Sequence, residues 1–415
     1  MKKEFDIVIS GGGLSGALMA LSLSDTKKPN GQHLSVAIVE ANPVLTDASL
    51  TFDDRVLALS HGTASYLESL GVWQSLKNVA EPIKNIHISD RGFYGKARLY
   101  AKHHQVNALG FVVEMSLLGQ ALLTTLKEKN AVNANVTWFA PDKISDITWQ
   151  KKHVELTLDS SEQLSAKLLL ACDGAHSICR KLANISIQES DYNQSALIAN
   201  VSTAIAHKNL AFERFTESGP IAMLPLSAQT NICNSNGARS NNDSRCSLVW
   251  TLPPEQAQNM NELSESQFKI ELERAFGSWL GAITHVGKRA IYPLKLLTAN
   301  EQVFHRTALI GNASHTIHPI AGQGFNLGVR DVSQMATLIN TALNNGSDIG
   351  SFAALSEYAK QRNQDHQHVI GLTDSLVTLF SNQLSPLVVG RNIGLKVMNY
   401  LTPLKNAIVR KTMGY

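Results

Sequence analysis

The chain has 415 residues, of which 44% are hydrophobic and 17% charged, so it is long enough for two or three well-packed domains and too apolar to be mainly disordered. The formal net charge of +3 is too close to balance to indicate a nucleic-acid partner. The four cysteines, Cys172, Cys179, Cys233 and Cys246, show no C-x-x-C spacing, so we expect reduced thiols in a cytoplasmic protein and no metal site. The sequence contains no apolar run long enough for a membrane span, and its N-terminus does not resemble a signal peptide.

The first part of the chain predicts a strand, a glycine turn, a helix and a second strand, which is the βαβ arrangement of a parallel sheet. These elements are expected at residues 5–10, 11–13, 14–24 and 34–40. Helical spacing follows at 64–76 and 116–129, and strands are expected at 154–158 and 164–171.

From about residue 195 the pattern changes to short apolar strands, expected at 196–202, 211–216, 221–226 and 246–252. The Asn- and Ser-rich stretch 228–245 is expected to be a long loop. One more buried strand is expected at 307–310, and the pattern after 327 is mainly helical. The fold class predicted is α/β, with a Rossmann-type domain interleaved with an antiparallel β-sheet domain and followed by C-terminal helices.

A G-x-G-x-x-G motif, formed by Gly11, Gly13 and Gly16, lies between the first strand and the first helix. Gly11 permits the tight turn, Gly13 lets a pyrophosphate approach the backbone, and Gly16 lets the helix pack closely on the strand. The helix N-terminus offers free N–H groups to phosphate. Glu40 ends the next strand, where a carboxylate can accept hydrogen bonds from a ribose diol. This context predicts dinucleotide binding but does not distinguish FAD from NAD.

Two further segments follow predicted strands. One contains Asp173 and Gly174, and the other begins at Gly311-Asn312 and continues through Pro319, Gly322, Gly324 and Asn326. Taken singly, each is better explained as a turn or a helix start than as a cofactor site.

Together and in this order, the three segments resemble the flavoprotein aromatic hydroxylases, the family that includes 4-hydroxybenzoate hydroxylase. The resemblance implies that NAD(P)H reduces a bound FAD and that dioxygen then forms a C(4a) hydroperoxide, which hydroxylates a phenol. It also implies three FAD-binding parts (1–75, 111–190 and 296–345), a β-sheet substrate domain (191–295, with the segment 76–110) and a C-terminal helical region (346–415).

The resemblance assigns roles to individual residues. Asp173 and Gly174 match a D-G pair linked to FAD and NAD(P)H binding. Gly311 and Asn312 occupy the position of a G-D pair that holds the ribitol, with Asn in place of Asp, and the amide still offers an acceptor oxygen. Arg55 matches an arginine that contacts the cofactor, although an exposed loop arginine would show the same pattern.

The loop from Pro319 to Gly324 matches the family segment along the flavin ring edge. Its backbone amides, with the helix N-terminus at Asn326, would stabilise negative charge on reduced flavin. We therefore expect His318, Pro319 and Gly322 to lie closest to the chemistry. Either His315 or His318 is placed to hydrogen-bond a phenol, unless nearby backbone satisfies the histidine.

Other stretches, at 72–76, 87–92, 212–220 and 386–392, resemble the ubiquinone-biosynthesis branch of the family. That branch implies a 2-polyprenyl-6-methoxyphenol substrate, hydroxylated to the 1,4-benzoquinol. Hydroxylation at another ring position of the same pathway stays open, as does a flavin-binding scaffold subunit, although the intact glycines favour an enzyme.

The last segment, 375–415, contains no Asp or Glu but carries the basic residues Arg391, Lys396, Lys405, Arg410 and Lys411 among spaced apolar residues. Such a surface closes the protein's own core or a dimer contact, or it docks at the inner face of a membrane or on an isoprenoid-delivering partner. The partners implied are the polyprenyl phenol and other ubiquinone-biosynthesis proteins.

Overall fold

The computed structural model describes residues 2–43, 55–227, 244–319 and 322–381, with single positions between 392 and 414. Its first sheet is mainly parallel and has the strand order β18-β19-β11-β1-β2-β8, with β9 and β10 added beside β11. These strands are β1 (Lys3–Ser10), β2 (Val36–Val39), β8 (Val136–Phe139), β9 (Ile144–Trp149), β10 (Val154–Leu158), β11 (Gln163–Ala171), β18 (Val303–Phe304) and β19 (Thr307–Leu309).

The helices are α1 (Leu14–Leu23), α2 (His61–Ser69), α3 (Trp73–Leu76), α4 (Met115–Asn133), α5 (Ile178–Leu182), α6 (Pro254–Glu262), α7 (Glu265–Phe276), α8 (Gln323–Asn344) and α9 (Phe352–Ser381), with 3-10 turns η1 (Ala101–His104) and η2 (Gly311–Ala313).

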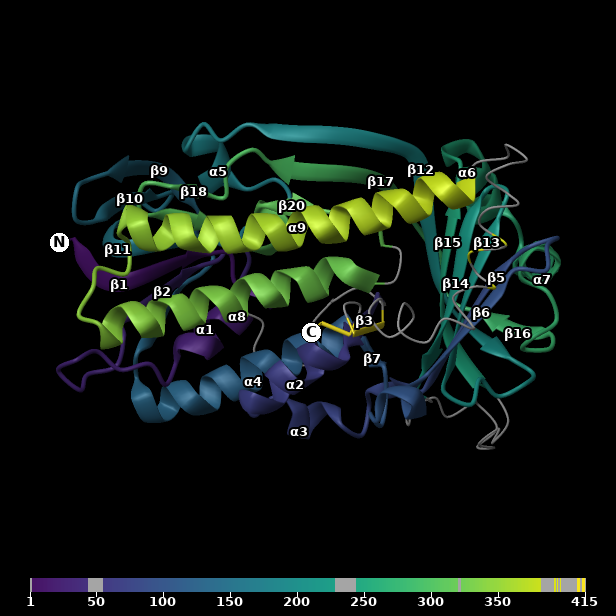
Figure 1. The fold of residues 1–415 in the computed structure, drawn as a ribbon. Helices are drawn as coiled ribbons and strands as arrows, with labels where there is room; N and C mark the ends of the chain where they lie inside the picture. Colours follow the sequence, from purple (N-terminus) through teal and green to yellow (C-terminus); the bar gives the residue numbers. More distant parts are fainter. Residues whose placement is uncertain are drawn as a thin grey trace.

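Both faces of the parallel sheet are covered, which explains why β1 is apolar without alternation. On one face Ile7 and Ile9 belong to a core shared with helices α1, α4 and α8. On the other face Val8 packs with the β9-β10 hairpin through Ile147 and Leu156. The parallel sheet is thus the middle layer of three (Figure 1).

The second sheet has the order β20-β17-β12-β15-β14-β13-β5-β6, with β16 beside β12. Its strands are β5 (Asn85–Asp90), β6 (Lys96–Tyr100), β12 (Ile187–Thr203), β13 (Leu210–Thr216), β14 (Gly219–Leu226), β15 (Ser244–Leu252), β16 (Ile283–Val286), β17 (Ala290–Ala299) and β20 (His315–Thr316). Helices α6 and α7 cover its outer face, where Phe212, Trp250 and Phe268 are buried, at the right-hand end of the molecule in Figure 1.

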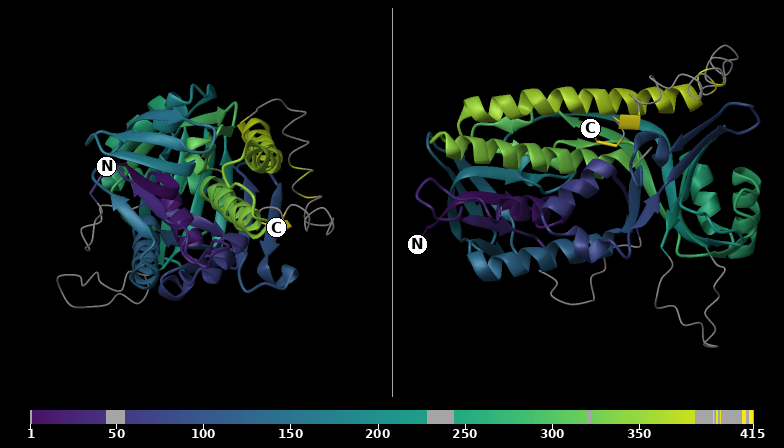
Figure 2. Two further views of the ribbon diagram at one scale, coloured as in Figure 1. Left: turned by 90° about the vertical axis from the view of Figure 1, so that its left-hand side faces the viewer. Right: turned by 60° about the horizontal axis from the view of Figure 1, so that its bottom comes forward.

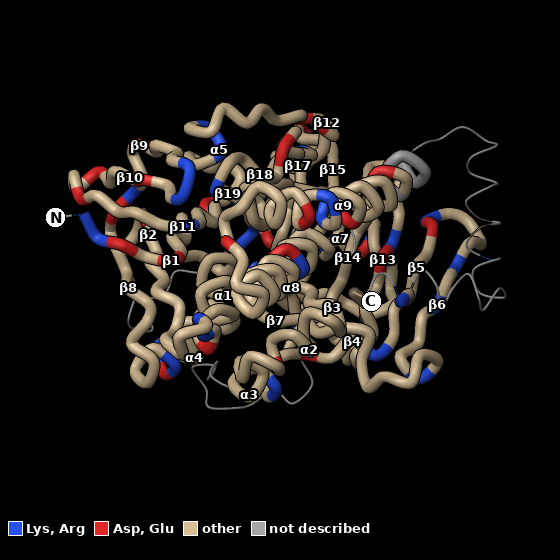
Figure 3. Tube along the Cα trace, turned by 60° about the vertical axis from the view of Figure 1, so that its left-hand side comes forward, with Lys and Arg blue, Asp and Glu red and all other residues tan. Residues whose placement is uncertain are grey.

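A third, small sheet, β3-β7-β4, lies between the two larger ones (Figure 1). Its strands are β3 (Val56–Ser60), β4 (Glu81–Ile83) and β7 (Gly110–Glu114). Helices α8 and α9 lie side by side, and α9 continues from the parallel sheet towards the second sheet (Figures 1 and 2). Lys and Arg are interspersed with Asp and Glu along the described chain (Figure 3).

Most elements expected from the sequence are confirmed, including β1, α1, α4, β10 and β11. The helix expected at 64–76 is two helices, because the chain turns at Gly71 between α2 and α3. The second sheet is not purely antiparallel, since β13 pairs in parallel with β5. The loop expected at 228–245 lies outside the described residues up to 243. Among the residues that are described, no helix combines the length and hydropathy needed to cross a bilayer.

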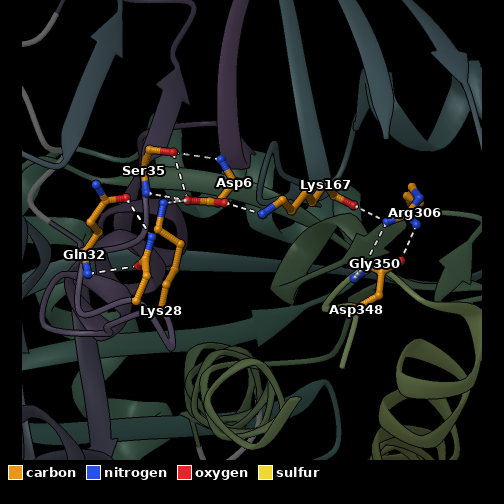
Figure 4. Close-up of polar contacts among 9 residues, drawn as sticks. Asp6, Lys28, Gln32, Ser35, Lys167, Arg306, Asp348 and Gly350 are labelled. Carbon is orange, nitrogen blue, oxygen red and sulfur yellow. Dashed lines mark hydrogen bonds and ion pairs between the residues drawn. The ribbon is translucent and has the colours of Figure 1, made fainter. Parts of the chain in front are cut away.

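Asp6 on β1 is a buried carboxylate that ties three segments together (Figure 4). Its Oδ2 accepts hydrogen bonds from the backbone N–H and hydroxyl of Ser35 and from Lys28 Nζ, each at 3.0 Å, and its Oδ1 accepts from Lys167 Nζ at 2.8 Å. Burial opposes ionisation, but these bonds outweigh it and lower the pKa of Asp6 to about 2.

Asp6→Asn should destabilise the fold by about 2 kcal/mol at pH 7, because the carboxylate has a pKa of about 2 when folded and 3.8 when unfolded. A depressed folded pKa gives stability that is present above pH 4 and disappears as the pH falls towards 2. Urea unfolding of the wild type and the variant at pH 7 and pH 3 measures the difference in their free energies of unfolding. This difference should be smaller at pH 3. Asp25→Asn, at an exposed ion pair with Lys129, is the control and should cost less than about 1 kcal/mol.

Candidate cofactor-binding and active site

The glycine turn between β1 and α1 has the form that a phosphate site requires. Gly11 lies in the left-handed region at φ +92°, and a Cβ there would be 2.6 Å from the backbone oxygen of Cys172. A Cβ on Gly16 would be 1.8 Å from the oxygen of Gly11. By contrast, a Cβ on Gly13 would meet no heavy atom of the described residues within 4 Å. Since no side chain of the described part caps α1, its N–H groups face this open space.

Glu40 lies directly beside the turn. Its Oε2 accepts a hydrogen bond from the Gly12 N–H at 2.7 Å, and its Oε1 accepts from the Asn42 N–H at 2.9 Å. Oε1 also accepts from Asn42 Nδ2 at 3.0 Å, so in this half-exposed side chain Oε2 is the oxygen that keeps a lone pair available. The carboxylate is therefore oriented by the turn itself.

The Asp173-Gly174 segment follows β11 and passes under the glycine turn, since a Cβ on Gly11 would be 2.9 Å from the Cα of Asp173. Asp173 Oδ2 accepts hydrogen bonds from the N–H groups of Ile178 and Cys179, at 2.9 and 3.1 Å. The carboxylate thus holds the first turn of α5, a local role that the sequence did not reveal. A Cβ on Gly174 would meet no described heavy atom within 4 Å, so space above it is open.

The third segment comes to the same place from the other end of the chain. A Cβ on Gly311 would be 3.1 Å from the hydroxyl of Ser15 on α1. The next residue, Asn312, is exposed, while the Gly311 N–H donates to Oδ2 of buried Asp331 at 2.9 Å. Asn312 is therefore exposed directly after the glycine that lies against α1, and no described residue hydrogen-bonds its amide.

The loop before α8 is held against β3. Gly322 has φ +60°, and a Cβ on it would be 2.7 Å from the Cβ of Ala58. The Asn326 amide donates to the backbone oxygens of Ala58 and Gly322 and accepts from the Ser60 N–H, at 2.7 to 2.8 Å. Asn326 thus joins α8 to β3, while a Cβ on Gly324 would have Ile317 as its one neighbour within 4 Å among the described residues.

Arg55 and Pro319 flank β3 and the loop before α8, respectively. Arg55 precedes β3, and its guanidinium lies 5.3 Å from the ring centre of Tyr292 on β17, which is a cation–π contact between the small sheet and the second sheet. Pro319 is half-buried at the end of the described loop; Ile320 and Ala321 lie outside the described residues.

The two histidines of this segment are both buried, and burial lowers the pKa of His315 to about 3 and that of His318 to about 4. Both are neutral at pH 7. The ring of His315 lies 4.2 Å from that of His366, behind the loop. The ring of His318 meets Tyr192 of β12 edge to face at 5.2 Å, so it lies beside the second sheet.

Asp331, on α8, forms a buried network that the sequence pattern did not reveal in full. Its Oδ1 accepts from Arg362 Nε at 2.6 Å and from His366 Nε2 at 2.8 Å, both on α9. His315, Asp331 and His366 offer ligand atoms within 4.8 Å of one another, but the Arg362 cation already balances the carboxylate. The network joins α8 and α9 to the Gly311 turn, and a cation there would face Arg362.

All three segments and β3 thus meet at the carboxyl ends of the parallel strands, where α/β sheets bind nucleotides. The exposed amide of Asn312 and the open spaces over Gly13 and Gly174 fit an extended dinucleotide lying across the junction.

Comparison with known proteins agrees with this geometry. Residues 4–372 match the family described as FAD binding domain. The chain is 33% identical to the ubiquinone hydroxylase UbiL of Rhodospirillum rubrum over 99% of this chain and 90% of that protein. It is 31% identical to the human mitochondrial ubiquinone biosynthesis monooxygenase COQ6, over 98% and 92% of the two chains. In fold it is similar to p-nitrophenol 4-monooxygenase PnpA from Pseudomonas putida, with a TM-score of 0.76 and 17% identity over 100% and 99% of the chains. The chain therefore belongs to the FAD-binding domain family, among the flavoprotein aromatic hydroxylases.

Proposed function

We propose that this FAD-dependent monooxygenase acts in ubiquinone biosynthesis by hydroxylating a 2-polyprenyl-6-methoxyphenol to the 1,4-benzoquinol. The observation that carries the proposal is the convergence of the cofactor segments with the second sheet, in a chain related to ubiquinone hydroxylases over almost its whole length. Resemblance of the stretches 72–76 and 212–220 to 2-octaprenyl-6-methoxyphenol hydroxylases supports the para position.

FAD, with NAD(P)H and dioxygen, supplies the redox chemistry when bound, and the residues of this chain position it. Gly13 and the α1 N-terminus would hold the pyrophosphate, Glu40 the ribose and Asn312 the ribitol. Asp173 and Gly174 would serve both FAD and NAD(P)H. Arg55 would contact the cofactor from β3.

The loop carrying His318, Pro319 and Gly322 would lie along the flavin ring, where backbone N–H groups and the α8 N-terminus favour negative charge. Burial of His318 helps to exclude water from this side. Gly311, Gly324 and Asn326 would shape the loop and hold it in place. The long strands β12 and β17 would contribute the substrate domain, and we keep the division into three FAD-binding parts, a β-sheet substrate domain and a C-terminal region as part of the proposal.

The test is to purify the protein, record its flavin spectrum and supply NAD(P)H, dioxygen and a soluble 2-methoxyphenol with a short alkyl group at C6. Mass spectrometry and NMR of the product should show the 1,4-benzoquinol. A product hydroxylated elsewhere would move the activity to another ring position of the pathway. A flavin-loaded protein that hydroxylates no phenol would support the scaffold reading instead.

Asn312→Asp should leave FAD bound, with an affinity within a few-fold of the wild-type value. Both side chains offer an acceptor oxygen at an exposed position beside the Gly311 turn. Flavin absorbance per folded protein, with circular dichroism to verify folding, measures the result. Loss of flavin from a folded variant would show that Asn312 does not occupy the ribitol position.

Contact with a membrane surface, or with other ubiquinone-biosynthesis proteins, is part of the proposal because the polyprenyl tail of the substrate is apolar. Most of the segment expected to mediate it, 375–415, lies outside the described residues. Flotation with anionic vesicles, but not neutral ones, is expected. The variant with Lys405, Arg410 and Lys411 changed to Glu should bind less, as should the wild type in high salt. Equal flotation of both proteins would contradict this role for the basic residues.

A further inference from the structure

The second sheet has two different faces. Its outer face packs on α6 and α7 through Phe212, Leu248 and Trp250. The alternate residues point the other way, towards the small sheet and α9 (Figure 1). On this inner face Leu224, like Val56 of β3, packs against a cluster that includes Val112 of β7, and Arg245 forms an ion pair with Glu114 of β7, with Nη2 and Oε1 3.1 Å apart. The inner face is thus the side on which the cofactor segments lie.

Glu213 lies on the inner face, because its strand neighbour Phe212 is on the outer one. The register places Glu213 between Ile88 of β5 and Ala222 of β14, and continues from Ala222 to Val249 and from Val249 to Ile198. All five residues of this row are half-buried, whereas their sequence neighbours Phe212, Met223, Leu248 and Leu197 on the outer face are fully packed. The row is therefore an apolar strip, incompletely covered from inside, with one carboxylate in it.

The Glu213 carboxylate makes no hydrogen bond and no ion pair with any residue that the structure describes. The charged groups on the inner face or on elements that pack against it include Asp90, Arg245 with its partner Glu114, Arg55, Glu81 of β4, which accepts from the Asn209 amide, and Asp374 of α9, which accepts from the Tyr192 hydroxyl. Asp90 accepts from Asn392. Because Glu213 is half-buried and no described residue hydrogen-bonds it, its carboxylate is left to water or to a ligand that displaces the water.

We infer that Glu213 receives the phenolic hydroxyl of the substrate, accepting its hydrogen bond on binding and its proton during hydroxylation. The inference rests on the proposed function and names a catalytic residue for it. The O–H bond of the phenol breaks, an O–H bond forms on the carboxylate, and the electron pair left on oxygen raises electron density at the ortho and para carbons. The oxygen atom added to the ring comes from dioxygen, and NAD(P)H supplies the two electrons. The other oxygen atom leaves as water, the second product. The apolar row would lie against the ring.

Burial raises the pKa of Glu213 to about 7, and none of the charged groups named above contributes to this shift. A base with a pKa near the working pH combines a large ionised fraction with useful proton affinity, whereas an ordinary glutamate is too weak. At pH 6 most Glu213 side chains would be protonated, and a neutral carboxylic acid is a weaker hydrogen-bond acceptor than a carboxylate and takes up no further proton. At pH 8 most would be ionised, so phenol binding should tighten by up to about tenfold between these values.

The experiment uses the full-length, FAD-loaded protein and the same soluble 2-methoxy-6-alkylphenol. Its Kd is measured from pH 6 to pH 8 by the change in flavin absorbance, together with the fraction of NAD(P)H consumption that yields hydroxylated product and not hydrogen peroxide. In Glu213→Gln the amide oxygen still accepts a hydrogen bond but takes no proton. We expect binding without pH dependence and at least a tenfold loss of product per NAD(P)H.

Glu217→Gln, an exposed glutamate on the same β13-β14 hairpin, is the matched control and should behave as wild type. If the Glu213→Gln protein does not retain FAD, the Glu213→Asp variant is tested in its place. It should still bind phenol in a pH-dependent way, with the midpoint of that dependence at a different pH. A Glu213→Gln enzyme with wild-type pH dependence and product yield would overturn the assignment while the proposed function stands. A wild-type protein that binds no phenol would overturn both.

Discussion

Gly13→Asp should produce a folded protein that carries no flavin. Gly13 is the N-cap of α1, with φ −66° and ψ −167°, which any residue can adopt. A Cβ there would meet no described heavy atom within 4 Å. Aspartate is a favoured N-cap, and its carboxylate would accept hydrogen bonds from the N–H groups that a pyrophosphate needs. The change therefore favours the helix and removes the anion site.

The electrostatic repulsion between an aspartate at position 13 and a bound pyrophosphate is large by itself. Two unit charges about 4 Å apart near a protein surface repel by about 4 kcal/mol, which corresponds to about a thousand-fold weaker binding. Flavin absorbance after purification and titration of apoprotein with FAD measure the effect. Gly13→Ala adds bulk without charge and should lose much less affinity. Bound flavin at wild-type stoichiometry in folded Gly13→Asp would place the pyrophosphate elsewhere.

Gly16→Ala should affect folding, in contrast to Gly13→Asp. Its Cβ would lie 1.8 Å from the Gly11 oxygen, so the helix must shift away from β1. We expect loss of stability and of flavin together, whereas Gly13→Asp loses flavin alone. A lower midpoint of thermal unfolding than that of the wild type, in the presence and absence of FAD, is the measurement. A Gly16→Ala protein with wild-type stability would show that α1 does not need this close approach.

The parts of the fold that follow from local pattern were predictable from the sequence. The buried run of β1, the glycines after it and the helix spacing of α1 all lie within about twenty residues, and periodicity reports such elements directly. The small sheet β3-β7-β4 and the parallel β13-β5 pair were not predicted, because each joins strands that are far apart in the chain. Their strands are short, and the residue pattern of one strand does not indicate which other strand it pairs with.

The same distinction separates the residues of the site. Gly11, Gly13 and Gly16 belong to a motif whose spacing carries its own physical reason. Glu213 stands within a stretch recognisable in the sequence, but its chemistry depends on which face of the sheet it occupies and on what fails to cover it. Asp173 and Asn326 were expected to serve a cofactor, and the structure adds local hydrogen bonds that hold α5 and β3, which sequence spacing does not reveal.

Asp331→Ala should destabilise the protein by about 3–5 kcal/mol, because it leaves the buried Arg362 guanidinium without its partner. Burial opposes ionisation of Asp331, but His366, His315 and Arg362 outweigh it and hold its pKa well below the usual value. The depressed pKa means that this stability is present above about pH 4 and is lost only as the pH falls through the folded value. Urea unfolding at pH 7 should show the full loss, with a smaller difference in strong acid.

The double variant Asp331→Ala/Arg362→Met separates the ion pair from the turn it supports. Removing both charges should restore most of the lost stability, since a buried ion pair replaced by apolar groups is often neutral. The Gly311 N–H, which donates to Asp331 at 2.9 Å, would still lack its acceptor. FAD affinity should therefore stay reduced in the double variant even where stability recovers, because the turn that presents Asn312 is no longer held. Full recovery of FAD affinity together with stability would show that Asp331 acts only through Arg362, and that the Gly311 turn keeps its shape without this hydrogen bond.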